Sequence, residues 1–253
     1  MAGWMVQRTG TSPEDGRAIA RLAQRHDAAV EHYRAGHAAT ALPLLEQIVF
    51  GCRAVLGEHH PDTLTAEGNL AVVYLGAGHD DDGLAALLEA CAVREREFGA
   101  DDPRTLTALD CLATAHRLLG NAGEAVRLGE AVVAARERVL GADHPDTFAS
   151  RLGVGLAYAD AYAVPQAVAV LTAALADAER AHDPGRRSTV EIRASLGCCL
   201  ALSGELGAAV REYDRAIADA AEHFGADHPE TVALREERRE LGAPTVPAPR
   251  AVD

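Results

Sequence analysis

One seven-residue phrase returns along the chain at a fixed spacing. Its copies read GEHHPDT, GADDPRT, GADHPDT and GADHPET, and they begin at Gly57, Gly99, Gly141 and Gly225. The spacings are 42, 42 and 84 residues, so one copy is missing. It should begin at Asp183, where DPGRRST keeps only the final threonine in register, and counting back from Gly57 reaches Asp15. A fixed period of this length predicts a stack of repeated structural units.

Aligned on the 42-residue period, the units share columns of matching side-chain size. A column of mostly large apolar residues is followed directly by one of small residues: Ala28, Leu70, Leu112, Val154 and Leu196, then Ala29, Ala71, Ala113, Gly155 and Gly197. After these come a mainly aromatic or histidine column, a turn column and a small column: His32, Tyr74, His116, Tyr158 and Leu200; Gly36, Gly78, Gly120, Tyr162 and Gly204; Ala41, Gly83, Ala125, Ala167 and Ala209. Helical spacing on both sides of a turn glycine predicts a helical hairpin in each unit.

The repeated phrase has the chemistry of a helix start. Its proline suits the first helical turn, where an N–H would have no partner, and the acid that follows in three of the four copies complements the helix dipole. The residues before the prolines also share a column, and we expect them to cap helices. Successive hairpins stack about 10 Å apart, so copies in one column cannot share a metal ion. The capping residues are His60, Asp102, His144 and His228.

This pattern of columns resembles the tetratricopeptide repeat, and the long period with its GxxHPxT opening is similar to the variant known from kinesin light chains and bacterial scaffold proteins. The resemblance implies an all-α, right-handed superhelical solenoid of about five helix hairpins, with a C-terminal capping helix in which Arg238 and Arg239 replace the core pair. The expected repeats are 15–56, 57–98, 99–140, 141–182 and 183–224, with a cap at 225–242. Residues 1–14 and the proline-rich 243–253 are expected to be disordered tails.

Composition limits the partners. The formal charge is -14, all 24 basic residues are arginine, and no basic block is present, so we expect neither nucleic acid nor a membrane as partner. The absence of lysine excludes a Schiff-base mechanism and a lysine-dependent phosphate loop, and it hints at a GC-rich bacterial genome. With no signal-length apolar stretch at the N-terminus, the expected compartment is the cytoplasm.

No residue pattern predicts catalysis, a cofactor or a metal. The five cysteines lack CxxC spacing, and the acidic triplet Asp80 to Asp82 lacks the alternation of a calcium loop. Cys198 and Cys199 lie about 100° apart on a helix, so one could be buried while the other faces the groove. No serine or cysteine nucleophile stands at helical spacing beside His26 or His116.

In the family that the chain resembles, the first helix of each hairpin lines a concave surface, and its columns that do not pack face the ligand. Mixed donors and acceptors in these columns suit a peptide or a polar small molecule. Arg117 is the preferred anchor, because its guanidinium can hold a carboxylate or carbonyl by two hydrogen bonds. Arg94 and Arg136 are expected on the opposite, convex face. The predicted groove residues are Tyr33, Arg34, Asn69, Asp110, Thr114 and Arg117.

Two functional hypotheses follow. The first is a non-catalytic scaffold that binds a peptide or protein segment in the groove. The alternative is a small-molecule binder or unusual enzyme of secondary metabolism, which an apolar pocket closed by Tyr162 and the irregular junction 183–188 would favour. A solvated groove with the partner bound elsewhere, or a sensor that works with a separate switch protein, remain further alternatives.

The paired large and small columns generate a stability prediction. We expect Leu112→Ala to cost about 2–5 kcal/mol through a cavity, and Ala113→Leu to cost about 1–3 kcal/mol through overpacking. Denaturant unfolding of the two variants measures both values. Wild-type stability in both would show that the register of the columns is wrong.

Overall fold

The structure is a computed structural model that describes residues 13–181 and 187–241, and these residues form helices and turns without a strand. The tails expected to be disordered lie outside this range, except Pro13 and Glu14, which begin the first helix. The described helices are α1 (Pro13–Arg34), α2 (Ala38–Leu56), α3 (Pro61–Gly76), α4 (Asp80–Phe98), α5 (Pro103–Leu118), α6 (Ala122–Val139), α7 (Pro145–Asp160), α8 (Val164–Arg180), α9 (Arg187–Leu202), α10 (Leu206–His223) and α11 (Pro229–Glu240).

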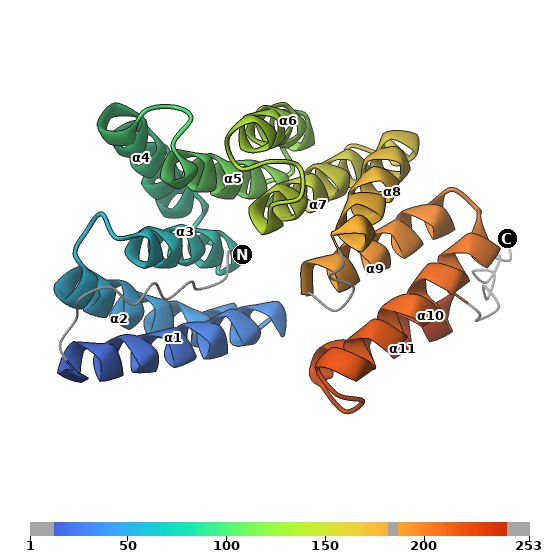
Figure 1. Ribbon diagram of the computed structural model, residues 1–253, viewed down its shortest axis with the longest axis horizontal. Helices are drawn as coiled ribbons and strands as arrows, with labels where there is room; N and C mark the ends of the chain where they lie inside the picture. The colour runs from blue at the N-terminus through green and yellow to red at the C-terminus, as the bar shows by residue number, and fades with distance from the viewer. Residues whose placement is uncertain (1–12, 182–186, 242–253) are drawn as a thin grey trace, which may run out of the picture. The chain divides into compact units, whose positions relative to one another are not determined.

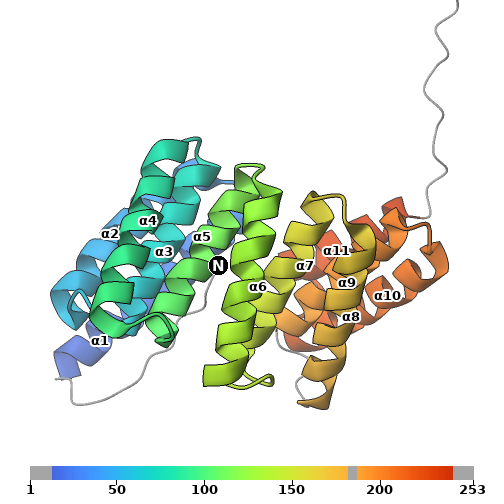
Figure 2. The same cartoon turned by 90° about the horizontal axis from the view of Figure 1, so that it is seen from above.

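Consecutive helices pack as hairpins, and the fold is an all-α repeat solenoid (Figures 1 and 2). The first helices of the hairpins, called A helices here, are α1, α3, α5, α7 and α9; the second, B helices, are α2, α4, α6, α8 and α10. The chain divides into two compact units, Met1–Ala142 and Asp143–Asp253. In unit 1, α3 packs against α2, α4 and α5; in unit 2, α9 packs against α7, α8 and α10.

The repeated phrase closes a loop and starts a helix, as predicted. His60 Nδ1 accepts the N–H of Asp62 at 3.2 Å, and Asp102 Oδ1 accepts that of Arg104 at 2.9 Å. The phrase's glycine has φ 91° at Gly57, a region that glycine adopts without a Cβ clash. Thr63 Oγ1 donates to the Gly57 carbonyl at 2.8 Å, which explains why the phrase begins with glycine and ends with threonine. The same caps occur at His144 and His228.

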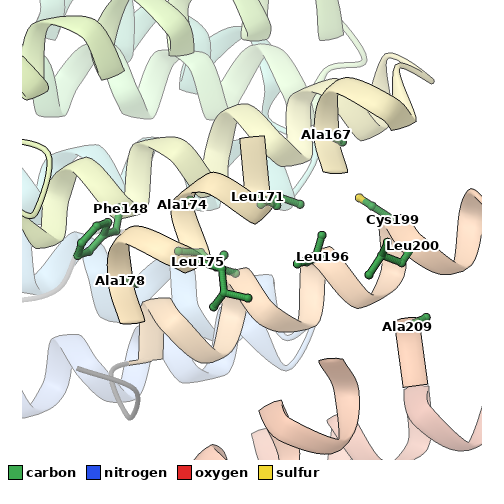
Figure 3. Packing of buried hydrophobic residues seen from close by; sticks show 11 residues of the cluster. Phe148, Ala167, Leu171, Ala174, Leu175, Ala178, Leu196, Cys199, Leu200 and Ala209 are labelled. Atoms are coloured by element: carbon green, nitrogen blue, oxygen red, sulfur yellow. The ribbon is translucent and has the colours of Figure 1, made fainter. Parts of the chain in front are cut away.

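The small column lets the helices of one hairpin approach closely. A Cβ at Gly155 of α7 would lie 2.5 Å from Leu171 Cδ2 of α8, and Leu171 is fully buried (Figure 3). A Cβ at Gly197 of α9 would likewise lie 2.8 Å from the Tyr213 ring of α10. The two glycines therefore serve packing between A and B helices in unit 2.

Arg193 of α9 is buried among acids from the helices on both sides. Its Nη2 lies 2.8 Å from Glu179 of α8, while its Nη1 and Nε lie 3.1 and 3.2 Å from Glu212 and Asp219 of α10. Burial raises the pKa of Asp219, and the nearby guanidinium opposes that rise. The cluster joins three helices of unit 2 through one side chain.

Among the described helices, α2 alone is long and apolar enough to cross a membrane by length and composition. Its Leu45, Ile48 and Cys52 are fully buried in a cluster with residues of α1 and α3. The same composition therefore also fits a core helix of unit 1.

Two glycines of α7 give a matched test of the packing. Gly155→Ala should destabilise by about 1–2 kcal/mol, because overpacking against Leu171 outweighs the gain in helix propensity. Gly153→Ala should stabilise by about 0.5–1 kcal/mol, because a Cβ there meets no atom within 4 Å. Chemical denaturation of both variants provides the measurement. A stabilised Gly155→Ala variant would contradict the close approach.

Candidate functional site

Three of the predicted groove residues form one stripe along α5. Asp110, Thr114 and Arg117 follow each other at helical spacing, and all three are half-buried. Thr114 Oγ1 donates to the Asp110 carbonyl at 3.1 Å. The Asp110 carboxylate lies 3.2 Å from Arg136 Nη1 of α6, so this acid is already engaged inside its own hairpin. Thr114 and Arg117 lie further along the same stripe and are half-buried.

Tyr33 of α1 reaches over the end of α3 toward this stripe. A Cβ at Gly76 would lie 2.4 Å from the Tyr33 ring, so a larger residue at this point would displace the ring from its present position. Burial raises the pKa of the Tyr33 hydroxyl, and the positive charge of Arg117 opposes that rise. The structure therefore brings Tyr33 of α1 into the electrostatic neighbourhood of Arg117 of α5. Arg34, by contrast, is exposed and lies 3.8 Å from Glu31 of the same helix.

Asn69 is in the interior. Its side chain is fully buried, and Nδ2 lies 2.8 Å from His26 Nε2, which joins α3 to α1. Asp27 Oδ1 lies 3.7 Å from His26 Nδ1, which favours the proton on Nδ1 and leaves Nε2 to accept from the amide. Direct ligand contact by Asn69 would require this pair to open. Asn69 was predicted to line the groove, but its side chain is buried, and Asn69→Ala would remove a buried partner of His26 and destabilise the fold.

The expected convex arginines are also buried. Arg94 and Arg136 are 3% and 4% exposed, and they occupy a B-helix column that elsewhere holds Cys52, Ala178 and Ala220. Arg94 Nη2 donates to Glu67 at 3.0 Å and to the Leu64 carbonyl at 3.3 Å. Each of these B-helix arginines thus pairs with an acid on the A helix of the same hairpin. The signal was present in the sequence, because an acid occurs in the A helix 27 residues before Arg94 and 26 before Arg136.

The thiols are not activated. Burial raises the pKa of Cys52 to about 12 and that of Cys91 and Cys199 to about 11. Cys198 is exposed while Cys199 is buried, an arrangement that the helical offset allows. Partial loss of water around the Cys198 thiol, together with the Glu237 charge, also raises the pKa of Cys198. A protonated thiol is a poor nucleophile. Among the described residues, no group of three or more histidines, cysteines or acids could hold a metal ion.

The features named for a small-molecule pocket lie only partly within the described residues. Tyr162 is 92% exposed. Residues 182–186 of the junction expected to join it lie outside the described range.

Comparison with known proteins decides the family. A family model described as tetratricopeptide repeat matches residues 21–62, 63–104, 105–146 and 189–230. The chain belongs to the tetratricopeptide repeat family. Proteins built from this repeat generally act as interaction scaffolds without catalysis of their own. The search of curated proteins found no match.

Solved structures support the kinesin-light-chain-like form of the repeat. A putative kinesin light chain from Podosopora anserina is 26% identical with a TM-score of 0.55, covering 80% of this chain and 96% of that one. BtubC (BKLC) from P. vanneervenii is 17% identical with a TM-score of 0.58, covering 86% and 95%. Bacillus thuringiensis PlcR, in complex with the peptide PapR7 and DNA, is 15% identical with a TM-score of 0.63, covering 87% and 74%. The last two show similarity of fold.

The buried His26–Asn69 pair predicts a pH dependence for unit 1. Burial lowers the pKa of His26 below its usual 6.5, although Asp27 opposes the shift. The unfolded chain therefore binds the proton more tightly, and the stability present above pH 6.5 is lost as the pH falls through the lower folded-state pKa. We expect the melting temperature to fall more between pH 7.5 and 5.5 in the wild type than in His26→Gln, which cannot titrate. The other histidines are common to both proteins. Equal losses would show that His26 does not carry the effect.

Proposed function

We propose that the chain is a non-catalytic scaffold that binds a segment of a partner protein along the A helices of unit 1. The observation that carries the proposal is the placement of Tyr33, Thr114 and Arg117. These side chains come from α1 and α5, and all three are half-buried. Polar groups that are partly withdrawn from water, yet still reachable, are suited to recognition of another polar molecule.

The chemistry of the three groups favours carbonyl or carboxylate oxygens as their partners. Arg117 offers a planar fork of N–H donors, and the Tyr33 hydroxyl can donate or accept. The Thr114 hydroxyl donates to the Asp110 carbonyl and can accept a further hydrogen bond. Tyr33 is held by its packing over Gly76, which lowers the entropy lost on binding. A peptide segment supplies such oxygens along its backbone. A polar small molecule with the same groups could meet the same donors, but no described feature favours it.

The structural neighbours are consistent with this use of the fold. PlcR, which has a similar fold, was solved with the peptide PapR7 bound. That observation belongs to PlcR, and at 15% identity it does not transfer to residues of this chain. The PlcR complex supports the proposal only by showing that a protein with a similar fold was solved together with a peptide.

Peptide selection against the full chain tests the proposal. Peptides selected from a random library on the immobilised protein are synthesised and titrated against variants. Arg117→Ala should weaken binding by about 1–3 kcal/mol, because a forked contact in a partly dry site is lost. Tyr33→Phe should weaken it by about 0.5–1.5 kcal/mol, because a single hydroxyl contact is lost. Isothermal titration calorimetry gives both values.

Arg127→Ala is the matched control, since Arg127 is an exposed arginine of α6 that pairs with Glu124 of the same helix. It should leave the affinity unchanged, and the melting temperature of each variant shows whether the fold is kept. Selected peptides that bind Arg117→Ala and Arg127→Ala with the affinity of the wild type would move the site away from these helices.

A further inference from the structure

The hairpin turns of the solenoid provide an internal comparison for Tyr162. Four of the five turn positions are glycine, with φ between 77° and 87°, and the fifth is Tyr162 with φ 58°. The backbone bonds are alike: the Ala163 N–H donates to the Tyr158 carbonyl at 2.9 Å, and the Glu205 N–H donates to the Leu200 carbonyl at 2.8 Å. A side chain at positive φ is strained relative to glycine. The turn itself therefore gives no reason for a tyrosine.

Packing gives no reason for it either, because Tyr162 is 92% exposed. The next turn of unit 2 also exposes apolar side chains: Leu202 is 65% and Leu206 is 51% exposed, and they flank Gly204. Tyr162 and Gly204 are 42 residues apart and hold the same turn position, while α9 packs against both α7 and α8 (Figure 1). These three side chains therefore lie along one edge of unit 2.

The apolar character continues from the turns onto the A helices. Half-buried Leu156 of α7 and exposed Cys198 of α9 share the column that holds Thr114 in α5. Cys198 and Leu202 are four residues apart and lie on the same face of α9. We call Leu156, Tyr162, Cys198, Leu202 and Leu206 the apolar edge. In the second repeat, the three positions in and beside the turn are Gly76, Gly78 and Asp80, so the repeat does not require apolar residues there.

Mainly acidic groups surround the apolar edge. Asp160 and Glu205 are exposed beside the turns, and the Glu237 carboxylate of α11 acts electrostatically on Cys198. No arginine or lysine occurs within 152–179 or 194–210. Among the flanking arginines, Arg151 pairs with Asp177, and Arg193 is buried among its three acids. The Arg211 guanidinium also comes near the edge, where its Nη1 would lie 3.7 Å from a Cβ at Gly207. Asp160, Glu205 and Glu237 thus bring acidic groups to the edge, and Arg211 brings a basic one.

We propose that the apolar edge of unit 2 binds a basic, amphipathic segment of another protein. Leucine-type side chains of the segment would pack on Leu202, Leu206 and Leu156, and its arginines or lysines would meet Asp160, Glu205 and the face of the Tyr162 ring. The acidic surroundings disfavour an anionic membrane surface at the same place. This site is separate from the one proposed on unit 1 and does not depend on it.

The test uses the full chain and a labelled 16-residue probe peptide, with leucines at helical i, i+3, i+4 and i+7 spacing and arginines at the remaining charged positions. Two comparison peptides are used. In the first, every arginine is replaced by glutamate; in the second, the residues are scrambled so that the helical periodicity is lost. Fluorescence anisotropy measures the affinities at two salt concentrations. We expect the basic amphipathic probe to bind at least tenfold more tightly than either comparison peptide, and added salt to weaken it.

The variants locate the binding. Tyr162→Gly should weaken the probe at least tenfold without lowering the melting temperature, since glycine relieves the turn, and Leu202→Gln should weaken it similarly. Phe50→Gln removes an exposed apolar side chain of α2 and should have no effect, which controls for general stickiness. Arg117→Ala should also leave the probe's affinity unchanged, so that failure here is distinguished from failure of the site on unit 1.

Several results would overturn the proposal. If the glutamate peptide bound as tightly as the arginine probe, charge complementarity would not explain the binding. If Phe50→Gln and Tyr162→Gly weakened the probe equally, the binding would not be located at the apolar edge. Sedimentation that shows a concentration-dependent dimer abolished by Tyr162→Gly, with no probe binding, would assign the edge to a second copy of this chain instead.

Discussion

The close approach of the two helices within a hairpin is the constraint on which the rest of the solenoid depends. A single hairpin has too little interior to bury its own apolar face, so each one must also pack against the next. Both contacts require that the A and B helices lie at a short, fixed distance. In unit 2 this distance is set by Gly155 against Leu171 and by Gly197 against Tyr213. A large side chain on the B helix is thus accommodated because the facing A-helix residue is a glycine without a side chain.

Much of this arrangement could be predicted from the sequence, because it depends on local chemistry that repeats. His60 and Asp102 cap their helices through atoms only two residues away, and Thr63 closes its loop onto Gly57. The caps recur in all four copies of the phrase, and the threonine bond recurs between Thr231 and Gly225, so the period of 42 residues specifies them. The large and small columns are equally regular, because every hairpin faces the same packing problem.

The features that were placed wrongly depend on contacts between residues far apart in the chain. Asn69 matches a groove position, yet it is buried and pairs with His26, which lies 43 residues earlier. Arg94 was expected at the surface, since arginine is rarely buried, but Glu67 of the A helix compensates its charge in the interior. The exposure of Tyr162 had a local signal, because it holds a hairpin-turn position and turns lie at the surface. What that signal did not reveal is the pair of exposed leucines at the neighbouring turn.

The buried Arg193 has a consequence for how unit 2 opens. Its guanidinium holds carboxylates from α8 and α10, so that moving either helix away strands a buried charge and exposes the others. Stacked repeats usually allow their ends to fray one hairpin at a time, since each contacts only its neighbours. A charge cluster shared by three helices works against such fraying. Helices α8, α9 and α10 should therefore exchange their amide hydrogens as one cooperative block, rather than in order from the C-terminal end.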